Sequence, residues 1–577
     1  MRISQRLELP LYGLITLILF VGACGSPAAW GAPARAAGFP VKIRGSGETS
    51  FTPVIPKGST VTDPVRYDAI VVGGGLAGMT SALYLTDRGK KVLILEKEEA
   101  LGGLAFGGNL PDGVPFNRGG SYWAAPYEEE EKILEHIGLG NFSELYTIHE
   151  PIDSYLWNGK FYPGIWEEET VEKLPASFAL FKHELKLADK AGLIPNQPFE
   201  EQNLELDAMN AAEWIRKMPS IAAARDDDES RKIHERFRKD PSIKPADPMG
   251  DVIGLMDLFC RSALGTTTER VSATAFANFY ISEIEPRYSG PKGTGQATKL
   301  LENILAERKH LAKVRLKATV TKIRQTKQGV KVEYVFGGRR HEASGDYAVF
   351  AAQLKFAPRI IDELSKNDPD RVKAIEETDY AHYSVHVAFV KGHPFRATYD
   401  TWTRAADYSP QDFTDVILGR WMDPAIRGYE GMRDFAKSPA DDRGILLIYH
   451  PFHLASELKR SKAMTKEHAV LVARQAVGRM LEIYSPFLKK TWGTKIDVTS
   501  VETNTWPYSI HIAKPGHFTR LARLLRKPFG RVFFANNNVG TPSFEEALFR
   551  GHCAANNVLK RTVDGFANEA WSRCPLE

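Results

Sequence analysis

The 577-residue sequence contains few cysteines and no long apolar segment beyond its N-terminal region. The four cysteines, Cys24, Cys260, Cys553 and Cys574, form no C-x-x-C pair, so neither a metal site nor a c-type haem attachment site is expected. Four scattered cysteines in so long a chain do not indicate a disulfide framework. No later segment has about 18 uninterrupted apolar residues, so we expect the body of the protein to be soluble.

The chain also lacks a concentration of one charge. Its formal net charge is +4 and the basic residues are dispersed, which argues against a nucleic acid partner. Apolar residues make up 43% of the chain and charged residues 25%, as in ordinary folded proteins. A chain of 577 residues is too long for one compact core, so we expect at least two lobes.

The first residues have the features of an export signal. Arg2 and Arg6 precede an apolar run from Leu11 to Ala23, which is too short to span a bilayer comfortably. The run ends in Val21-Gly22-Ala23-Cys24, which resembles a bacterial lipoprotein box. In that pattern the cysteine is lipidated and becomes the mature N-terminus, while cleavage after Ala36 is the alternative.

These features predict a signal peptide over residues 1–23 and a tether over residues 24–65, rich in Ala, Pro and Gly at its start. We expect a protein exported to the bacterial cell envelope, on its periplasmic face. Its contact with the membrane is expected only through a lipid anchor at Cys24.

A glycine-rich motif follows the first strongly apolar run of the body. Residues 67–72 predict a buried parallel strand, and residues 76–88 predict a helix that Gly89 ends. A second apolar run, residues 92–95, ends at Glu96. Together these segments predict a β-α-β unit.

The glycine motif predicts dinucleotide binding through its backbone geometry. Gly73 permits the tight turn, Gly75 lets the backbone approach the pyrophosphate, and Gly78 allows close packing of helix on strand. Leu76 and Ala77 begin the helix, so their N–H groups and the positive dipole end face the phosphates.

The residue after the second strand supports this prediction. Glu96 can accept hydrogen bonds from a pair of ribose hydroxyls. An ordinary glycine-rich turn is the alternative for such a motif. Here the strand, helix, second strand and acidic residue all stand where dinucleotide binding requires them.

Three further segments indicate which dinucleotide the protein binds. They are Lys97 to Leu104, with the paired glycines Gly102 and Gly103; Phe116 to Trp123, with Arg118, Gly119, Gly120 and Ser121; and Gly530 to Asn538. Their order resembles the flavin-containing amine oxidase superfamily, which includes monoamine and polyamine oxidases, phytoene desaturases and protoporphyrinogen oxidase. The resemblance implies non-covalent FAD, with the paired glycines beside its ribityl and pyrophosphate and the second segment near the flavin ring.

Some positions depart from the family pattern. Leu104 stands where the family has an arginine, and Asn536 and Asn537 replace a glycine or glutamate and an acidic residue. Asparagine can still hydrogen-bond ribityl or phosphate oxygens. The resemblance also implies that Val320 contacts the adenine through its backbone. The resemblance further implies that Ser543 and Phe544 begin a helix beneath the flavin, whose N–H groups would polarise the N1–C2=O edge.

The fold class that we expect is α/β, with a discontinuous Rossmann-type FAD lobe and a second, mixed-sheet substrate lobe. The FAD lobe is predicted over residues 66–150, 285–375 and 515–565. The substrate lobe is predicted over residues 151–284 and 376–514, with a tail over residues 566–577.

Aromatic residues predict the class of substrate, and the absence of a lysine predicts the kind of electron acceptor. Residues 504–508, which include Trp506 and Tyr508, resemble spermidine dehydrogenase-type proteins, and Phe544 stands at the family's aromatic position on the substrate face. These three side chains would form a cage for an amine, or they pack in the core instead. The family's flavin-proximal lysine has no counterpart in residues 380–386. This favours a dehydrogenase that transfers hydride from a small amine or polyamine to flavin N5 and uses a separate electron acceptor.

Two alternatives stay open. One is a desaturase or isomerase of a hydrophobic polyene or porphyrin-like substrate. The other is a non-catalytic flavin-binding lipoprotein. His382, His386, His511 and His552 are candidates for a base, although a single histidine is more often structural.

Overall fold

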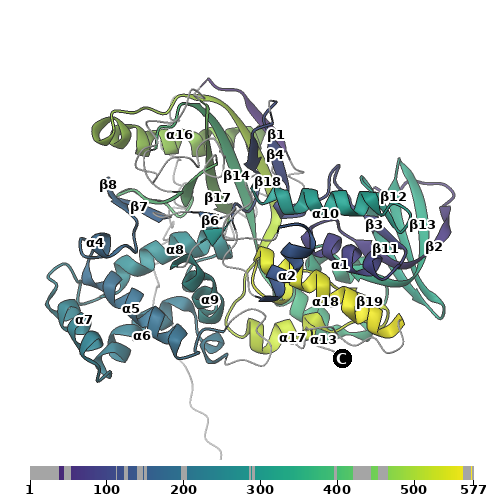
Figure 1. Ribbon diagram of the computed structural model, residues 1–577, viewed down its shortest axis with the longest axis horizontal. Coiled ribbons are helices and arrows are strands. Elements are labelled where there is room, and N and C mark those ends of the chain that lie inside the picture. The colour runs from purple at the N-terminus through teal and green to yellow at the C-terminus, as the bar shows by residue number, and fades with distance from the viewer. Residues whose placement is uncertain are drawn as a thin grey trace, which may run out of the picture.

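A computed structural model describes the body of the chain. The described residues are 38–44, 54–111, 113–122, 128–139, 147–148, 153–195, 204–284, 287–288, 293–395, 399–419, 443–452, 466–562 and 574. Within these ranges no helix combines the length and apolar character needed to cross a membrane. The predicted signal peptide and Cys24 lie outside the described residues. Two large sheets organise the fold (Figure 1).

The first sheet has seven strands and contains the predicted β-α-β unit. Its parallel strands, in spatial order, are β10 (Ala312–Arg315), β3 (Val92–Leu95), β2 (Val61–Val72), β13 (Arg339–Phe350) and β19 (Val532–Phe534). Helix α1 (Leu76–Asp87) connects β2 to β3. The sheet is therefore assembled from three distant parts of the chain.

An antiparallel extension continues this sheet beyond the parallel strands. β11 (Thr319–Thr326) pairs with β12 (Gly329–Phe336), which pairs with β13. Gly337 and Gly338 make the turn between β12 and β13, with φ of 56° and 71°. This conformation favours glycine, because a Cβ is rarely accommodated there.

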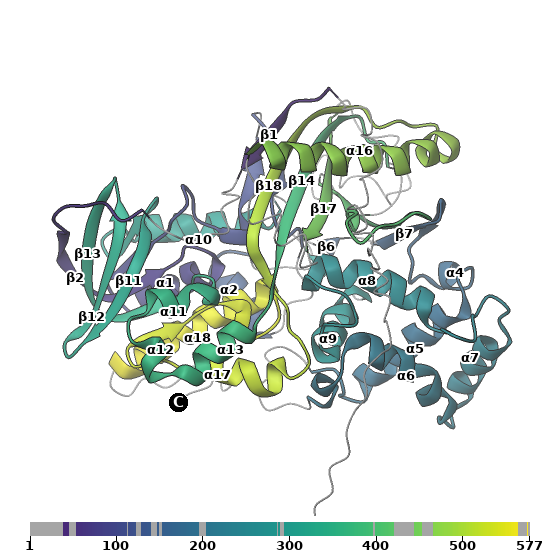
Figure 2. The same cartoon turned by 180° about the vertical axis from the view of Figure 1, so that it is seen from behind.

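Helices cover both faces of the first sheet. On one face α1, α2 (Glu128–His136), α10 (Gly295–Glu307) and α18 (Phe544–Thr562) share an apolar core with the strands. On the other face lie α11 (Ala357–Ile360), α12 (Leu364–Asn367), α13 (Pro369–Glu377) and α17 (Ala522–Arg526), whose buried residues form a second core (Figure 2).

The second sheet has eight strands and is mixed. Its order is β1 (Val41–Arg44), β18 (Val498–His511), β14 (Tyr380–Lys391), β17 (Arg443–Phe452), β16 (Asp415–Leu418), β15 (Asp400–Arg404), β7 (Asp153–Trp157) and β8 (Lys160–Pro163). Helix α16 (Lys466–Thr491) contributes Val477, Met480 and Tyr484 to the core of this sheet. These sheets and helices confirm the α/β fold class.

A helical group lies beside the second sheet (Figure 1). Its members are α4 (Glu168–Val171), α5 (Ala176–Lys190), α6 (Ala211–Ala223), α7 (Asp228–Lys239), α8 (Gly250–Leu264) and α9 (Ala273–Ile284). They bury a common apolar core that also takes in Tyr155 of β7 and Trp402 of β15. The helices therefore pack against the β7–β15 side of the second sheet.

The segment predicted as a tether contains two ordered stretches. Residues 41–44 form β1, which pairs in parallel with residues 501–504 of β18, and the buried ring of Phe39 joins the core of that sheet. The alternation of Val41 and Ile43 with basic residues suits an edge strand, which explains this difference from the expected tether. β2 also starts earlier than expected, at Val61.

Candidate functional site

The three glycines of the motif meet different surroundings. A Cβ on Gly73 would touch the backbone of Ala351 at 2.9 Å, and a Cβ on Gly78 would clash with the carbonyl oxygen of Gly73. A Cβ on Gly75 would meet only the Cα of Gly103, 3.9 Å away. Protein packing therefore requires glycine at 73 and 78. At 75 the protein leaves open space, which suits a pyrophosphate close to the backbone.

The N-terminus of α1 is suited to bind an anion. Leu76 and Ala77 begin the helix, its N-cap residue Gly75 has no side chain to cap it, and the first turn contains no acidic residue. Its first N–H groups are therefore not used by a capping side chain. Such a terminus offers donors and a positive dipole end to phosphate oxygens.

Glu96 lies at the carboxyl end of β3, next to this turn. Its Oε2 accepts a hydrogen bond from the Gly74 N–H at 2.6 Å, and its Oε1 accepts one from the Glu98 N–H at 2.8 Å. Burial raises the pKa of the Glu96 carboxyl, while these hydrogen bonds oppose the rise. Lys97, by contrast, pairs with Glu98 at the surface, so its side chain does not face the glycine turn.

Val320 lies in a strand whose approach runs beside Glu96. It is a buried residue of β11, at an irregularity in the pairing with β12. The preceding Ala318 donates its N–H to the carbonyl oxygen of Glu96 at 2.8 Å. The backbone before Val320 is therefore joined to the backbone of Glu96, the residue that we predict to bind ribose.

The paired glycines lie against the glycine motif. The Gly102 N–H donates to the Gly74 carbonyl at 2.8 Å, and a Cβ on Gly103 would lie 3.3 Å from the Cα of Gly75. The next carbonyl, that of Leu104, accepts the Gly120 N–H at 3.3 Å. Residues 102–104 therefore join the glycine motif to the segment that starts at Arg118.

Residues 118–121 are held by hydrogen bonds to each of their four carbonyl oxygens. The donors are Trp506 Nε1 to Arg118 at 2.8 Å, Tyr449 OH to Gly119 at 2.6 Å, Thr294 Oγ1 to Gly120 at 2.7 Å, and both Asn117 Nδ2 and Tyr399 OH to Ser121 at 3.1 Å. Gly119 also approaches the Leu104 carbonyl so closely that any Cβ would clash. We call residues 118–121 the clamped segment.

The side chain of Arg118 points away from the glycine motif. Its Nε lies 2.5 Å from Oε1 of Glu502, and its Nη1 donates to the carbonyl oxygen of Gly107 in β4 (Gly107–Asn109) at 2.7 Å. The guanidinium also lies 5.0 Å from the ring centres of Phe106 and Phe116. The guanidinium of Arg118 therefore already has partners within the protein. Arg118 would contact a cofactor through its backbone and not through its side chain.

The C-terminal loop approaches the same region. The side chain of Asn536 accepts the Asn538 N–H at 3.1 Å and lies 3.4 Å from the Ala352 carbonyl. Asn537 is partly exposed. Ser543 Oγ accepts the Glu546 N–H at 3.1 Å and so caps α18.

Phe544 brings the start of α18 to the clamped segment. A Cβ on Gly120 would lie 3.0 Å from the Phe544 ring.

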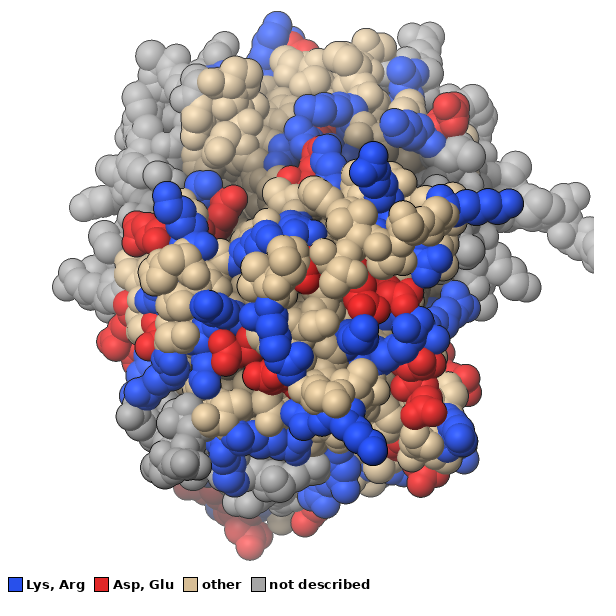
Figure 3. Space-filling view, turned by 90° about the vertical axis from the view of Figure 1, so that its right-hand side faces the viewer, with Lys and Arg blue, Asp and Glu red and all other residues tan. Residues whose placement is uncertain are grey.

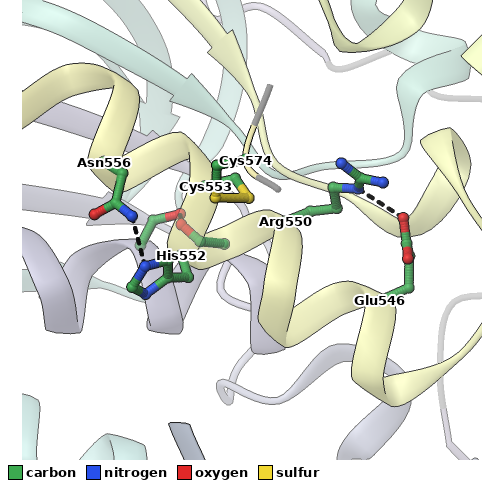
Figure 4. The surroundings of a disulfide bond; sticks show 8 residues. Glu546, Arg550, His552, Cys553, Asn556 and Cys574 are labelled. Carbon is green, nitrogen blue, oxygen red and sulfur yellow. Dashed lines mark hydrogen bonds and ion pairs between the residues drawn. A yellow bond between two sulfur atoms is a disulfide. The ribbon is translucent and has the colours of Figure 1, made fainter. Parts of the chain in front are cut away.

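Farther along α18, Glu546 and Arg550 form a buried ion pair at 2.6 Å. One turn on, Cys553 forms a disulfide with Cys574 (Figure 4).

The structure separates two of the predicted aromatic residues. Trp506 is bonded to Arg118 and so lies at the clamped segment, as Phe544 does. Tyr508 has φ of 53°, unusual for a strand residue. Its ring lies 4.6 Å from the His382 ring and 4.0 Å from Nζ of Lys355. The sequence pattern did not reveal this turn of the backbone.

Sequence reasoning missed a pair of contacting tyrosines, one of which is bonded to the clamped segment. Tyr383 and Tyr449 lie on the adjacent strands β14 and β17, with ring centres 5.4 Å apart and planes at 88°. Tyr449 bonds to Gly119, and Tyr383 OH lies 3.0 Å from Ser262 Oγ of α8. Strands buried on both faces show no alternation that would single out these residues.

Buried carboxylates lie near the two tyrosines. Asp415 of β16 is the register partner of Tyr449, so both side chains leave the same face of the sheet. Asp400 of β15 is fully buried. Burial raises the pKa of Tyr449 and Tyr383, and the negative charges of Asp415 and Asp400 raise it further.

All four candidate histidines are buried, and burial lowers the pKa of His386, His511 and His552. His386 Nε2 lies 3.3 Å from His450 Nδ1, and burial lowers the pKa of His450 to about 4. His511 donates through Nε2 to the Gly540 carbonyl at 2.8 Å, and burial lowers its pKa to about 4. Burial also lowers the pKa of His552 to about 3. The hydrogen bonds and burial of these histidines indicate structural roles.

These features fit FAD. An extended cradle runs from the glycine motif through residues 102–104 to the clamped segment, with an open face over Gly75 and an uncapped helix N-terminus beside it. Glu96 offers carboxylate oxygens at one end, and aromatic residues gather at the other. The donor set suits a dinucleotide whose far end carries a planar ring.

Comparisons with known proteins agree with this cradle. Residues 76–559 match the model of the flavin-containing amine oxidoreductase family. Amine oxidase [flavin-containing] B of Sus scrofa is 23% identical over 529 residues, which cover 88% of this chain and 89% of that protein.

Solved structures show the same fold. Cyclohexylamine oxidase from Brevibacterium oxydans IH-35A superposes with a TM-score of 0.56 at 18% identity, covering 86% of this chain and 100% of that one. A fatty acid isomerase from P. acnes superposes with a TM-score of 0.55 at 15% identity, covering 86% and 99%. The fold is therefore shared by proteins of different named activities.

Proposed function

Because the chain belongs to the flavin-containing amine oxidoreductase family, we propose that it oxidises an amine or polyamine and passes the electrons to an acceptor other than oxygen. It is an FAD-dependent oxidoreductase. FAD, when bound, supplies the chemistry by accepting a hydride at N5 from the carbon next to the amine nitrogen.

The observation that carries the amine proposal is the group formed by Tyr383, Tyr449 and Asp415. The two rings stand at right angles, Tyr449 is bonded to the clamped segment, and the register partner of Tyr449 is a buried carboxylate. Aromatic faces and a carboxylate attract a cationic group, most strongly where water is excluded. A polyene or porphyrin would gain nothing from a buried carboxylate.

The same surroundings would prepare the reacting nitrogen. Burial between Trp506 and the two tyrosines lowers the pKa of an amine, because the charged form is desolvated. The neutral form can then release hydride without a strong protein base. Asp415 would hold a second ammonium group when the substrate is a diamine or polyamine.

The choice of a dehydrogenase is supported by the side chains of β14. Residues 380–386, where the family has its flavin-proximal lysine, read Tyr-Ala-His-Tyr-Ser-Val-His. Lys355 is near Tyr508 but precedes α11, in a different part of the chain. We therefore expect slow reaction with oxygen and a separate electron acceptor.

Anaerobic titration of the bound flavin tests these proposals. Spermidine or a simple amine should bleach the flavin absorbance, and carotenoid precursors should not. Bleaching by a carotenoid precursor alone would favour the desaturase alternative, and no bleaching by any amine would refute amine oxidation. Rapid peroxide formation under air would refute the dehydrogenase proposal.

A variant of Asp415 tests the substrate class. Asp415→Asn should raise KM for a diamine at least tenfold and change KM for a monoamine of similar length much less, because only the diamine carries a second ammonium group. Asp407→Asn, at a largely exposed carboxylate, is the matched control. Equal effects on both substrates would remove Asp415 from substrate binding.

We also propose that the protein is exported and lipidated at Cys24. The buried disulfide between Cys553 and Cys574 supports export, because such bonds persist in oxidising compartments (Figure 4). Mass spectrometry of the mature N-terminus tests the proposal directly. A diacylated Cys24 is expected; an N-terminus at residue 37 would mean cleavage after Ala36 instead.

A further inference from the structure

Exposed apolar side chains gather at one end of the first sheet. Among the described residues, eight large apolar side chains are exposed, and five of these are at this end: Val54, Ile55, Val61, Val65 and Phe336. Val54 is 87% exposed and Ile55 55%. Single exposed apolar residues are common, but a group of them marks an interaction surface.

The start of β2 and the end of β12 lie side by side at this end of the sheet. Val61 at the start of β2 is the register partner of His341 in β13. The His341 ring lies 5.6 Å from the ring of Phe336, which ends β12 at the Gly337-Gly338 turn. We call residues 54–65 and 336–341 the sheet tip. It projects from the side of the molecule opposite the helical group (Figures 1 and 2).

The sheet tip is also basic. The sheet tip contains one acidic residue, Asp63, whose side chain is buried and pairs with Arg315 at 2.7 Å, and it includes the basic residues Lys57, Arg339 and Arg340. Arg339 forms no ion pair within the described part of the chain, and Arg340 reaches Glu333 only at 3.8 Å. Viewed from this end, lysines and arginines are spread over the face among apolar and neutral atoms, with Asp and Glu side chains between some of them (Figure 3).

We propose that the sheet tip docks on an anionic lipid surface. Apolar side chains on a projecting turn can enter the headgroup region, while adjacent arginines attract anionic headgroups. This contact is independent of the proposed substrate and of lipidation at Cys24, and it adds a second membrane contact to the expected anchor.

A fluorescent probe at the sheet tip tests the proposal. Phe336→Cys, labelled with an environment-sensitive dye, is compared in the full-length holoprotein with a labelled Leu471→Cys. Leu471 is 50% exposed on α16, in the other part of the molecule, and the native Cys260 is buried. Vesicles of phosphatidylcholine with phosphatidylglycerol should shift the emission at 336 to the blue and leave that at 471 nearly unchanged.

The electrostatic part of the proposal has its own test. Replacing Arg339 and Arg340 by alanine should weaken the apparent vesicle affinity roughly 10- to 30-fold, since each basic residue near an anionic surface contributes about fivefold. High salt should have a similar effect. Equal shifts at positions 336 and 471, equal shifts on pure phosphatidylcholine, or no shift at 336 would each overturn the proposal.

Discussion

Glu502 and Arg118 form a buried ion pair that joins the second sheet to the clamped segment. Their side chains are each 7% exposed, and Nε of Arg118 lies 2.5 Å from Oε1 of Glu502. Arg44 of β1 approaches the other carboxylate oxygen at 3.1 Å. One carboxylate in β18 thus connects the N-terminal strand to the segment beside the predicted flavin.

Neutralising this carboxylate should destabilise the protein. Glu502→Gln leaves the buried guanidinium of Arg118 without a counter-charge, a change that typically costs about 3–5 kcal/mol. Urea unfolding of the holoprotein measures the loss, and flavin release should occur at lower urea. Glu98→Gln is the control, because its pair with Lys97 is half exposed and contributes about 1 kcal/mol at most. Equal losses in both variants would contradict the buried role of Glu502.

The glycine motif offers a matched pair of substitutions. Gly75→Ala should weaken FAD binding at least tenfold and leave the apoprotein stable, because the added Cβ meets protein only at 3.9 Å. Gly78→Ala should destabilise the apoprotein by about 1–3 kcal/mol, because its Cβ would clash with the Gly73 carbonyl. Flavin retention and thermal unfolding of the apoprotein separate the two effects. Unfolding of both variants at the same lowered temperature would refute the distinction.

The disulfide should stabilise the C-terminal part of the chain. A bond between cysteines 21 residues apart restricts the unfolded chain, which corresponds to about 3 kcal/mol in the chain-entropy model. Adding a reductant should lower the thermal midpoint of the wild-type protein. A double variant with serine at positions 553 and 574 should start from the lower midpoint and show no response to reductant. A response in that variant would show that the wild-type effect has another source.

Acid should destabilise the protein through its buried histidines. His511 has its pKa lowered to about 4, so the unfolded chain binds a proton below about pH 6.5 that the folded chain does not. Stability from this group is present above pH 6.5 and is lost as the pH falls towards 4. It should decrease by about 2 kcal/mol between pH 7 and pH 5.

Urea unfolding at these two pH values tests this expectation. In His511→Gln the difference in unfolding free energy between pH 7 and pH 5 should shrink by about 2 kcal/mol. His310→Gln, at an exposed position before β10, should leave that difference unchanged. An unaltered pH dependence in the His511 variant would show that the ring is not kept neutral by burial.

The first sheet was predictable because its signals are local. The apolar run of β3 matches the predicted residues 92–95, and α1 spans Leu76 to Asp87 within the predicted 76–88. Each of these elements is set by neighbours in sequence: an apolar run, a glycine turn or a helix stop. The family match confirms FAD, which the resemblance of the glycine segments implied.

The second sheet was harder to predict because its pairings are distant. Arg118 and Glu502 are 384 residues apart, and no local pattern connects them. All side chains from Tyr380 to Ala388 are buried, so the sequence of β14 does not tell which face carries Tyr383. Tyr508 shows the same difficulty, since its positive φ turns the ring away from Trp506 and towards Lys355.

The clamped segment has a consequence for anyone who wishes to redesign this enzyme. Its four carbonyl oxygens accept hydrogen bonds from Trp506 and Tyr449 of the second sheet, from Tyr399 just before β15 and from Thr294 at the start of α10, so any change in its backbone breaks several bonds at once. Libraries aimed at new substrates should therefore leave residues 118–121 and their donors intact. Variation is better directed to positions on β16 and α8, where a side chain can change without breaking the hydrogen bonds of the clamped segment.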